Sequence, residues 1–129
     1  MGLTYVPVVC YHDRQRVEVR MLVDSGASYS LLPAEVWQKL GLVPMRTISI
    51  QLADGTILRR PLSECMLEIE GERATSPVIL GSERDIALLG AISLETVGLV
   101  LNPFTRTLHP MRMLVPSLTT VPGGIESDE

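Results

Sequence analysis

Hydrophobic and polar residues alternate with a period of two along much of the chain, which is typical of half-buried β-strands. The alternation is clearest in residues 17–22, 48–52 and 66–70. Two further segments, residues 77–81 and 86–90, are almost wholly apolar and predict short strands, the second of them running through the interior. The pattern therefore predicts an all-β fold.

Helix is predicted only in two short pieces. Residues 34–40 contain good helix formers, with Pro33 suited to the first helical position and Gly41 to the position after the last turn. Residues 93–97 form the second predicted helix, in which the first residue, a serine, would be the N-cap and Gly98 would follow the end.

One turn between alternating segments has a clear signature. Asp54 and Gly55 separate residues 48–52 from residues 56–60. Because both turn residues tolerate a positive φ, the pair predicts a β-hairpin with a type I′ turn. Pro61 is expected to limit the ladder of the second strand, since proline has no N–H to donate.

Composition indicates one globular domain. The chain has 129 residues, of which 46% are hydrophobic and 20% charged. This length and balance suit a single domain with its own core, which we place at residues 1–115. Residues 116–129 are rich in Ser, Thr, Pro, Gly and acids. They predict a disordered acidic tail, because they offer too little apolar surface to offset the entropy of ordering.

Several functional classes are disfavoured. The net charge of −4 argues against a nucleic-acid partner. No apolar run approaches the roughly 20 residues of a membrane-spanning helix, so no membrane partner is expected. The first residues lack the pattern of a secretion signal, which favours a cytoplasmic location. Cys10 and Cys65 are too few for a disulfide framework and are expected to be reduced.

Residues 21–28 are the clearest candidates for chemistry. They read Met-Leu-Val-Asp-Ser-Gly-Ala-Ser, so a hydrophobic strand leads Asp24 into a turn of small residues. Gly26 allows close backbone approach, and Ser25 and Ser28 can hold the loop through short-range hydrogen bonds. A carboxylate fixed in this way suits acid–base catalysis. The same residue types also form ordinary turns, so the triplet alone is a weak signal.

A second motif strengthens the signal. Leu88-Leu89-Gly90 follows later in the chain, with the Asp54-Gly55 hairpin between the two motifs. In these motifs and their order, the chain resembles the retropepsin-like aspartic proteases, the single-lobed enzymes of retroviral type, over about residues 3–108. The resemblance implies a closed, mostly antiparallel barrel with one or two short helices, which forms half of an active enzyme.

The resemblance also implies a homodimer. Aspartic proteolysis needs two carboxylates that share one proton, because like charges about 3 Å apart cannot both ionise at low cost. The chain has one Asp-Ser-Gly, so the second Asp24 would come from an identical subunit. The expected activity is that of an aspartic endopeptidase acting on extended segments of a peptide or protein substrate, with no metal or other cofactor.

Individual residues take roles from the same resemblance. Asp24 of each subunit would activate a water, Ser25 would hydrogen-bond across the dimer, and Gly26 would lie against the substrate backbone. The Asp54-Gly55 hairpin would be a flap that closes over the substrate. The predicted substrate-binding residues come from the loop, the flap and the second motif, with Leu31 as a further apolar candidate. They are Ala27, Ser28, Ala53, Asp54, Gly55, Ile86 and Leu88.

Other functions stay open at this point. The same fold could serve as a catalytically silent dimer that grips peptides, or as a structural dimer in which Asp24 braces the interface. Residues 10–13 include metal-ligand types, but their spacing matches no familiar zinc site. Ser25 lacks the Gly-x-Ser-x-Gly setting of a serine nucleophile. Trp37, on the first predicted helix, is expected to pack in the core.

Overall fold

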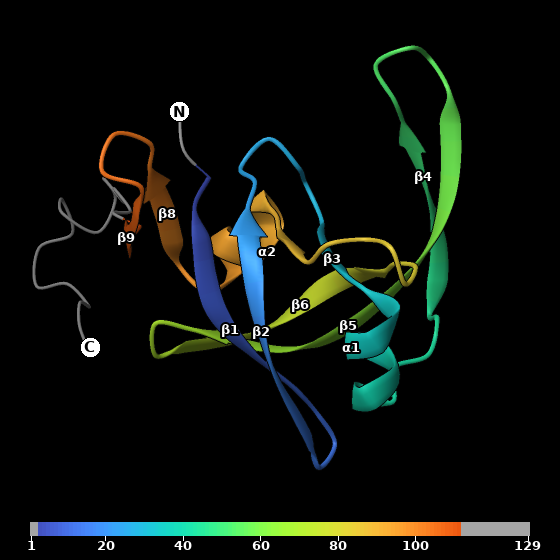
Figure 1. Cartoon of the computed structure of the whole chain (residues 1–129), viewed down its shortest axis with the longest axis horizontal. Helices are drawn as coiled ribbons and strands as arrows, with labels where there is room; N and C mark the ends of the chain where they lie inside the picture. Colours follow the sequence, from blue (N-terminus) through green and yellow to red (C-terminus); the bar gives the residue numbers. More distant parts are fainter. Residues whose placement is uncertain (1–2, 112–129) are drawn as a thin grey trace, which may run out of the picture.

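The computed structural model describes residues 3–111, and the chain is all-β with two short helices, as the alternation predicts (Figure 1). The predicted tail at residues 116–129, and with it the predicted end of the domain, lies outside the described residues. In chain order the elements are β1 (Tyr5–His12), β2 (Gln15–Val23), β3 (Ser30–Leu32), α1 (Ala34–Leu40), β4 (Arg46–Gln51), β5 (Ile57–Ile69), β6 (Glu72–Leu80), β7 (Leu88–Leu89), α2 (Ala91–Thr96), β8 (Leu99–Asn102) and β9 (Thr107–Pro110).

Seven of the strands form one curled sheet. Their order is β1-β2-β7-β3-β6-β5-β4, and β1 also pairs with β5, so the sheet returns on itself as a barrel-like body. Most ladders are antiparallel, whereas β2–β7 and β3–β6 are parallel. The barrel is not formally closed, and its shortest strand, β7, contributes only Leu88 and Leu89 to the ladders. Strands β8 and β9 form a separate two-stranded sheet.

The inward positions of these strands form one main core. Fully buried side chains include Val8 on β1, Met21 on β2, Leu67 on β5 and Leu89 on β7. Trp37 is half-buried on α1 and packs against this core, and its indole Nε1–H donates to the carbonyl of Gly81 over 2.8 Å. The helix is therefore attached to the barrel by both packing and a hydrogen bond.

Both cysteines lie in this core as free thiols. Cys10 and Cys65 are buried on the adjacent strands β1 and β5. The side-chain hydrogen bond with Cys65, together with burial, raises the pKa of the Cys10 thiol well above its ordinary value. Because the thiolate is the reactive form, burial and the raised pKa both disfavour reactions of Cys10 in the folded protein.

The turn at Asp54 differs from the predicted type I′ turn. Of the two turn residues only Gly55 has a positive φ, at 90°. The Gly55 amide donates to the Leu52 carbonyl over 2.9 Å, and the Leu52 amide donates to the Thr56 carbonyl over 2.7 Å. These bonds define a three-residue loop in which the glycine takes the left-handed position. The prediction was wrong in turn type because it counted Asp54 as a second left-handed residue.

A pair of consecutive left-handed residues occurs instead between β5 and β6. Glu70 and Gly71 have φ of 51° and 83°, and the two strands pair up to Ile69 and Glu72 on either side. The sequence pattern predicts that a strand ends here, but it does not predict this two-residue turn.

Pro61 limits one of the two ladders of its strand, as predicted, without interrupting the strand. Strand β5 runs without interruption from Ile57 to Ile69, and Pro61 lies opposite Thr47 of β4. The ladder between β5 and β6 begins one residue later, at Leu62. The missing N–H of Pro61 therefore lies where β5 has a partner on one side only, which is where strands tolerate proline.

The helices differ from the prediction at their beginnings. Helix α1 spans the predicted residues and is followed by Gly41 with a φ of 75°, but Pro33 lies at the N-cap rather than in the first turn. Helix α2 begins at Ala91, after Gly90, so Ser93 is a buried residue inside the helix and not its cap. Neither helix in residues 3–111 is long and apolar enough to span a membrane.

Candidate active site

Asp24 is the first residue after β2 and lies at the start of the loop that leads to β3. Its amide donates to the carbonyl of Leu89 over 2.9 Å, and its own carbonyl accepts from the Ala27 amide over 3.0 Å. Its carboxylate oxygen Oδ1 accepts from the Gly26 amide over 3.1 Å. The backbone of Asp24 is thus held from both sides, while the side chain remains exposed to solvent.

The two residues that follow Asp24 differ in their surroundings. A Cβ atom on Gly26 would lie 3.3 Å from Asp24 Oδ1, a tight contact with the oxygen that accepts the Gly26 amide. Ser25 is exposed, and its hydroxyl makes no hydrogen bond to the part of the chain that the structure describes. That hydroxyl is available to a group outside this chain.

The second motif lies directly beneath this loop. Beyond the Asp24–Leu89 bond, the amides of Ala91 and Ile92 donate to the carbonyls of Ala27 and Ser28 over 2.8 and 3.0 Å. Residues 89–92 therefore hold the loop both before and after its turn. The two motifs, far apart in the sequence, form one hydrogen-bonded unit.

Gly90 makes the closest approach within this unit. A Cβ atom at this position would lie 2.6 Å from both the carbonyl carbon and the carbonyl oxygen of Tyr29. Real Cβ atoms do not come so near to backbone, and the Gly90 backbone is itself ordinary extended chain with a φ of −95°. Glycine is required here for space rather than for an unusual backbone angle.

The predicted flap is the hairpin formed by β4 and the first part of β5. In Figure 1 its tip and the loop after β2 both point toward the top of the view, with the tip apart from the loop. Residues 51–57 are all exposed. At the tip, Asp54 Oδ1 accepts from the Thr56 amide over 2.9 Å. Hydrogen bonds from the side chain and backbone of Thr56 hold the pKa of Asp54 below its ordinary value, so the tip carries a negative charge.

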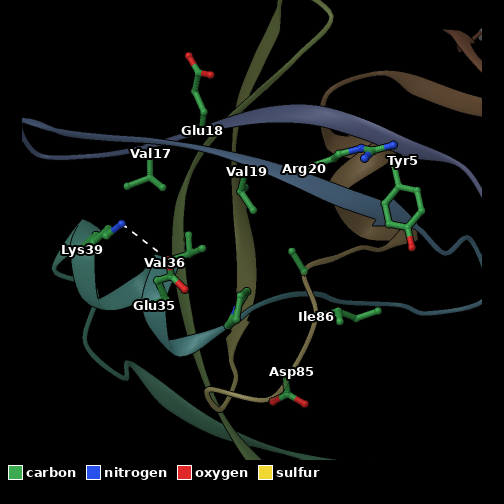
Figure 2. A pocket seen from close by; sticks show the side chains of 12 residues that line it. Tyr5, Val17, Glu18, Val19, Arg20, Glu35, Val36, Lys39, Asp85 and Ile86 are labelled. Carbon is green, nitrogen blue, oxygen red and sulfur yellow. Dashed lines mark ion pairs between the residues drawn. The ribbon is translucent and has the colours of Figure 1, made fainter.

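The remaining predicted substrate-binding residues lie in two environments. Leu88 pairs with Leu22 on one side and Leu31 on the other, two residues before Gly90. Ile86 is 58% exposed and lines a hollow of about 460 Å³ between β2, α1 and the segment before β7. Figure 2 shows this hollow, which also has Val19, the Glu35–Lys39 ion pair and other residues of β2 and α1 along its sides. Asp24 is not among its lining residues.

Metal-ligand residue types do not assemble into a cluster. Within residues 3–111, no three side chains of His, Cys, Asp or Glu lie close enough together to hold an ion. His12 Nδ1–H donates to the carbonyl of Leu40 over 2.9 Å, at the end of α1. Its neighbour Cys10 points into the core.

Sequence analysis missed three serines near the candidate site. Ser30, Ser76 and Ser93 are fully buried and hydrogen-bond to one another. The sequence contains one feature that could have indicated Ser30: it is a serine next to two leucines, Leu31 and Leu32, at an inward position of a short strand. Ser93 gave a misleading signal, because serine at the start of a helical segment is also the usual N-cap.

Comparison with known proteins decides the family. A family model described as aspartyl protease matches residues 9–91, which is well over half of the chain and includes both motifs. The chain belongs to this aspartyl protease family. No match is found among curated proteins.

The fold of this aspartyl protease family member is similar to that of solved retroviral proteases. The chain is similar to the protease of simian foamy virus (mac), with a TM-score of 0.53 and 16% identity over 70% of this chain and 91% of the viral one. It is also similar to the EIAV protease solved with the inhibitor HBY-793, with a TM-score of 0.57 and 16% identity over 75% of this chain and 89% of the viral one. The retropepsin-like fold expected from the two motifs is confirmed.

Proposed function

We propose that this protein is an aspartic endopeptidase that hydrolyses peptide bonds in extended polypeptide segments, as a homodimer with one Asp24 from each subunit. The observation that carries the proposal is the setting of Asp24. Its backbone is fixed to Leu89 and Ala27 while its carboxylate is exposed, in a chain that belongs to an aspartyl protease family. A fixed backbone with an exposed carboxylate suits a group that must meet both a partner carboxyl and a substrate.

In the proposed mechanism the two Asp24 carboxyl groups share one proton. The ionised member removes a proton from a bound water, which attacks the scissile carbonyl. The protonated member donates to the developing oxyanion, and a later proton transfer releases the amine. Ser25 would hydrogen-bond across the dimer and Gly26 would lie against the substrate backbone. No covalent intermediate forms on the protein.

The homodimer is supported by apolar surface as well as by the single Asp24. Three large apolar side chains near the two ends of the described chain are exposed: Leu3 by 67%, Val100 by 48% and Phe104 by 93%. Val100 belongs to the two-stranded β8–β9 sheet, and Phe104 lies in the turn that connects its two strands. A two-stranded sheet is marginal by itself and gains stability by adding strands or packing. A second copy would cover this surface.

The substrate would lie between the Asp24 loop and the β4–β5 hairpin, which would close over it as a flap. Ala27 and Ser28 lie in the loop, and Leu88 directly precedes Leu89, whose carbonyl accepts from the Asp24 amide. Ala53, Asp54 and Gly55 form the exposed tip of the hairpin. The proposed role of Ile86 is the least supported by its position, because its side chain faces the hollow beside α1.

A subunit-mixing experiment tests the shared site. Wild-type protein is mixed with an equal amount of Asp24→Asn protein and incubated until the subunits exchange. Cleavage of a peptide substrate is then measured. Random exchange leaves about one quarter of the dimers with two aspartates, so activity per total dimer falls to about one quarter, whereas chains that act alone retain about half. Asp13→Asn is the matched control, because Asp13 is an exposed turn residue at the other end of β2.

Peptide binding and sedimentation velocity, measured on the same two proteins, separate the other functions. A peptide-binding module would show no cleavage by wild-type protein but would still hold peptides, with or without Asp24. A structural dimer braced by Asp24 would lose its assembly in Asp24→Asn, which sedimentation velocity detects. Either result would replace the endopeptidase proposal.

A further inference from the structure

Three buried serines beneath the candidate site form a continuous chain of hydrogen bonds. Ser30 Oγ lies 2.9 Å from the Gly90 amide nitrogen and 2.5 Å from Ser93 Oγ, which in turn lies 2.7 Å from Ser76 Oγ. Ser76 Oγ lies 3.1 Å from the carbonyl oxygen of Pro77. All three serine side chains are fully buried. The chain connects β3, α2 and β6, three elements that are distant in the sequence.

The two ends determine the direction of every bond. The Gly90 amide can only donate, so Ser30 Oγ accepts from it, and the Pro77 carbonyl can only accept, so Ser76 donates to it. Ser76 has then used its one proton, so Ser93 must donate to Ser76, and Ser30 must donate to Ser93. Each hydroxyl therefore donates once and accepts once in one direction, an arrangement in which neighbouring bonds strengthen one another.

The donor end of this chain is part of the unit that holds Asp24. Gly90 lies between Leu89, whose carbonyl accepts from the Asp24 amide, and Ala91, whose amide donates to the Ala27 carbonyl. Gly90 is also pressed against the backbone of Tyr29. A shift of Gly90 would therefore move the two loop hydrogen bonds made by its neighbours on either side.

We propose that Ser30, Ser93 and Ser76 are positioning residues that hold the Asp24 loop in its catalytic geometry through Gly90. This inference rests on the proposed endopeptidase function. The serines do not touch the substrate, and they act by anchoring residues 89–92 to β3 and β6. Removing one hydroxyl leaves a buried partner unsatisfied and interrupts the chain at that point.

The test compares Ser30→Ala, Ser93→Ala and the double variant on a peptide that the wild type cleaves. Misplacing reacting groups by about 1 Å costs on the order of 100-fold in rate, so we expect each single variant to lose roughly 10- to 100-fold in kcat with KM changed by less than about 3-fold. The double variant should lose about as much as one single variant, because both interrupt the same chain. Ser30→Thr, which keeps the hydroxyl, should recover most of the lost kcat.

Ser63→Ala is the matched control. Ser63 is a buried serine on β5 whose hydroxyl makes no hydrogen bond within residues 3–111, so its removal should leave kcat unchanged. An unchanged kcat in folded Ser93→Ala dimers would overturn the proposal, as would independent, multiplicative losses in the double variant. If Ser93→Ala does not fold, Ser76→Ala tests the same chain from its acceptor end and carries the same expectations.

Amide hydrogen exchange separates failure of this inference from failure of the proposed function. In Ser93→Ala the amides of Gly90, Ala91 and Ile92 should exchange faster, while those of the β1–β2 ladder stay protected. If the wild type cleaves no peptide but exchange increases as expected, the endopeptidase proposal fails and the positioning of the loop stands. If exchange at these amides is unchanged, the positioning role is wrong whether or not the protein cleaves peptides.

Discussion

The amide of Asp24 donates a 2.9 Å hydrogen bond to the carbonyl of Leu89, which joins the two sequence motifs of the chain at the end of β2. This bond continues the short parallel ladder in which Leu22 and Val23 lie beside Leu88 and Leu89. The candidate catalytic residue is therefore placed by strand pairing rather than by its loop alone. Loops carry chemistry best when a rigid scaffold positions them.

The close contact at Gly90 predicts a large loss of stability in Gly90→Ala. The new Cβ would lie 2.6 Å from the Tyr29 backbone, which cannot give way as a flexible side chain can. Overpacking of this kind costs about 1–3 kcal/mol or more. Urea denaturation should show a lower free energy of unfolding, and cleavage should be lost with it. Wild-type stability in this variant would show that the loop and the second motif are not packed as described.

Gly26→Ala should separate activity from stability. Its Cβ would meet only the Asp24 carboxylate, at 3.3 Å, and a side chain can turn away from such a contact. We expect a midpoint of unfolding close to that of the wild type, and a loss in kcat/KM of roughly tenfold or more, since the displaced atom belongs to the carboxylate that the proposed mechanism uses. Full activity in a stable Gly26→Ala protein would contradict the proposed geometry at Asp24.

Short-range patterns account for what the sequence predicts well. Alternation identifies most of the strands. The two short motifs, residues 21–28 and residues 88–90, indicate the family and the fold. Prediction fails where the deciding contact is distant in the sequence. Ser93 lies inside α2 and not at its N-cap, and there it meets Ser30 and Ser76 from two other strands. No local pattern reports these contacts.

The charge at the hairpin tip predicts how the tip responds to pH. Hydrogen bonds from Thr56 lower the pKa of Asp54, so the ionised carboxylate stabilises the turn. A carboxyl group with a lowered folded pKa contributes its full stabilisation above the unfolded value, which is about 3.9, and loses it as pH falls through the folded pKa. The tip should therefore keep its structure and its negative charge above about pH 4.

Thr56→Val tests this account of the tip. Losing the Thr56 hydroxyl should raise the pKa of Asp54 toward its ordinary value, while the bond from the Thr56 amide remains. An NMR titration of the Asp54 carboxyl carbon measures the change, with Thr47→Val on the adjacent strand β4 as control. An unchanged Asp54 pKa in Thr56→Val would show that the Thr56 hydroxyl does not bind the carboxylate.

The central claim is that Asp24 catalyses peptide hydrolysis, and one measurement tests it most directly. Purified wild-type protein, Asp24→Asn and the control Asp13→Asn are incubated with a diverse peptide library between about pH 4 and 7, and the products are identified by mass spectrometry. The account predicts cleavage by the wild type and by Asp13→Asn, and none by Asp24→Asn. Cleavage that persists in Asp24→Asn, or no cleavage by a folded wild-type dimer, would contradict it.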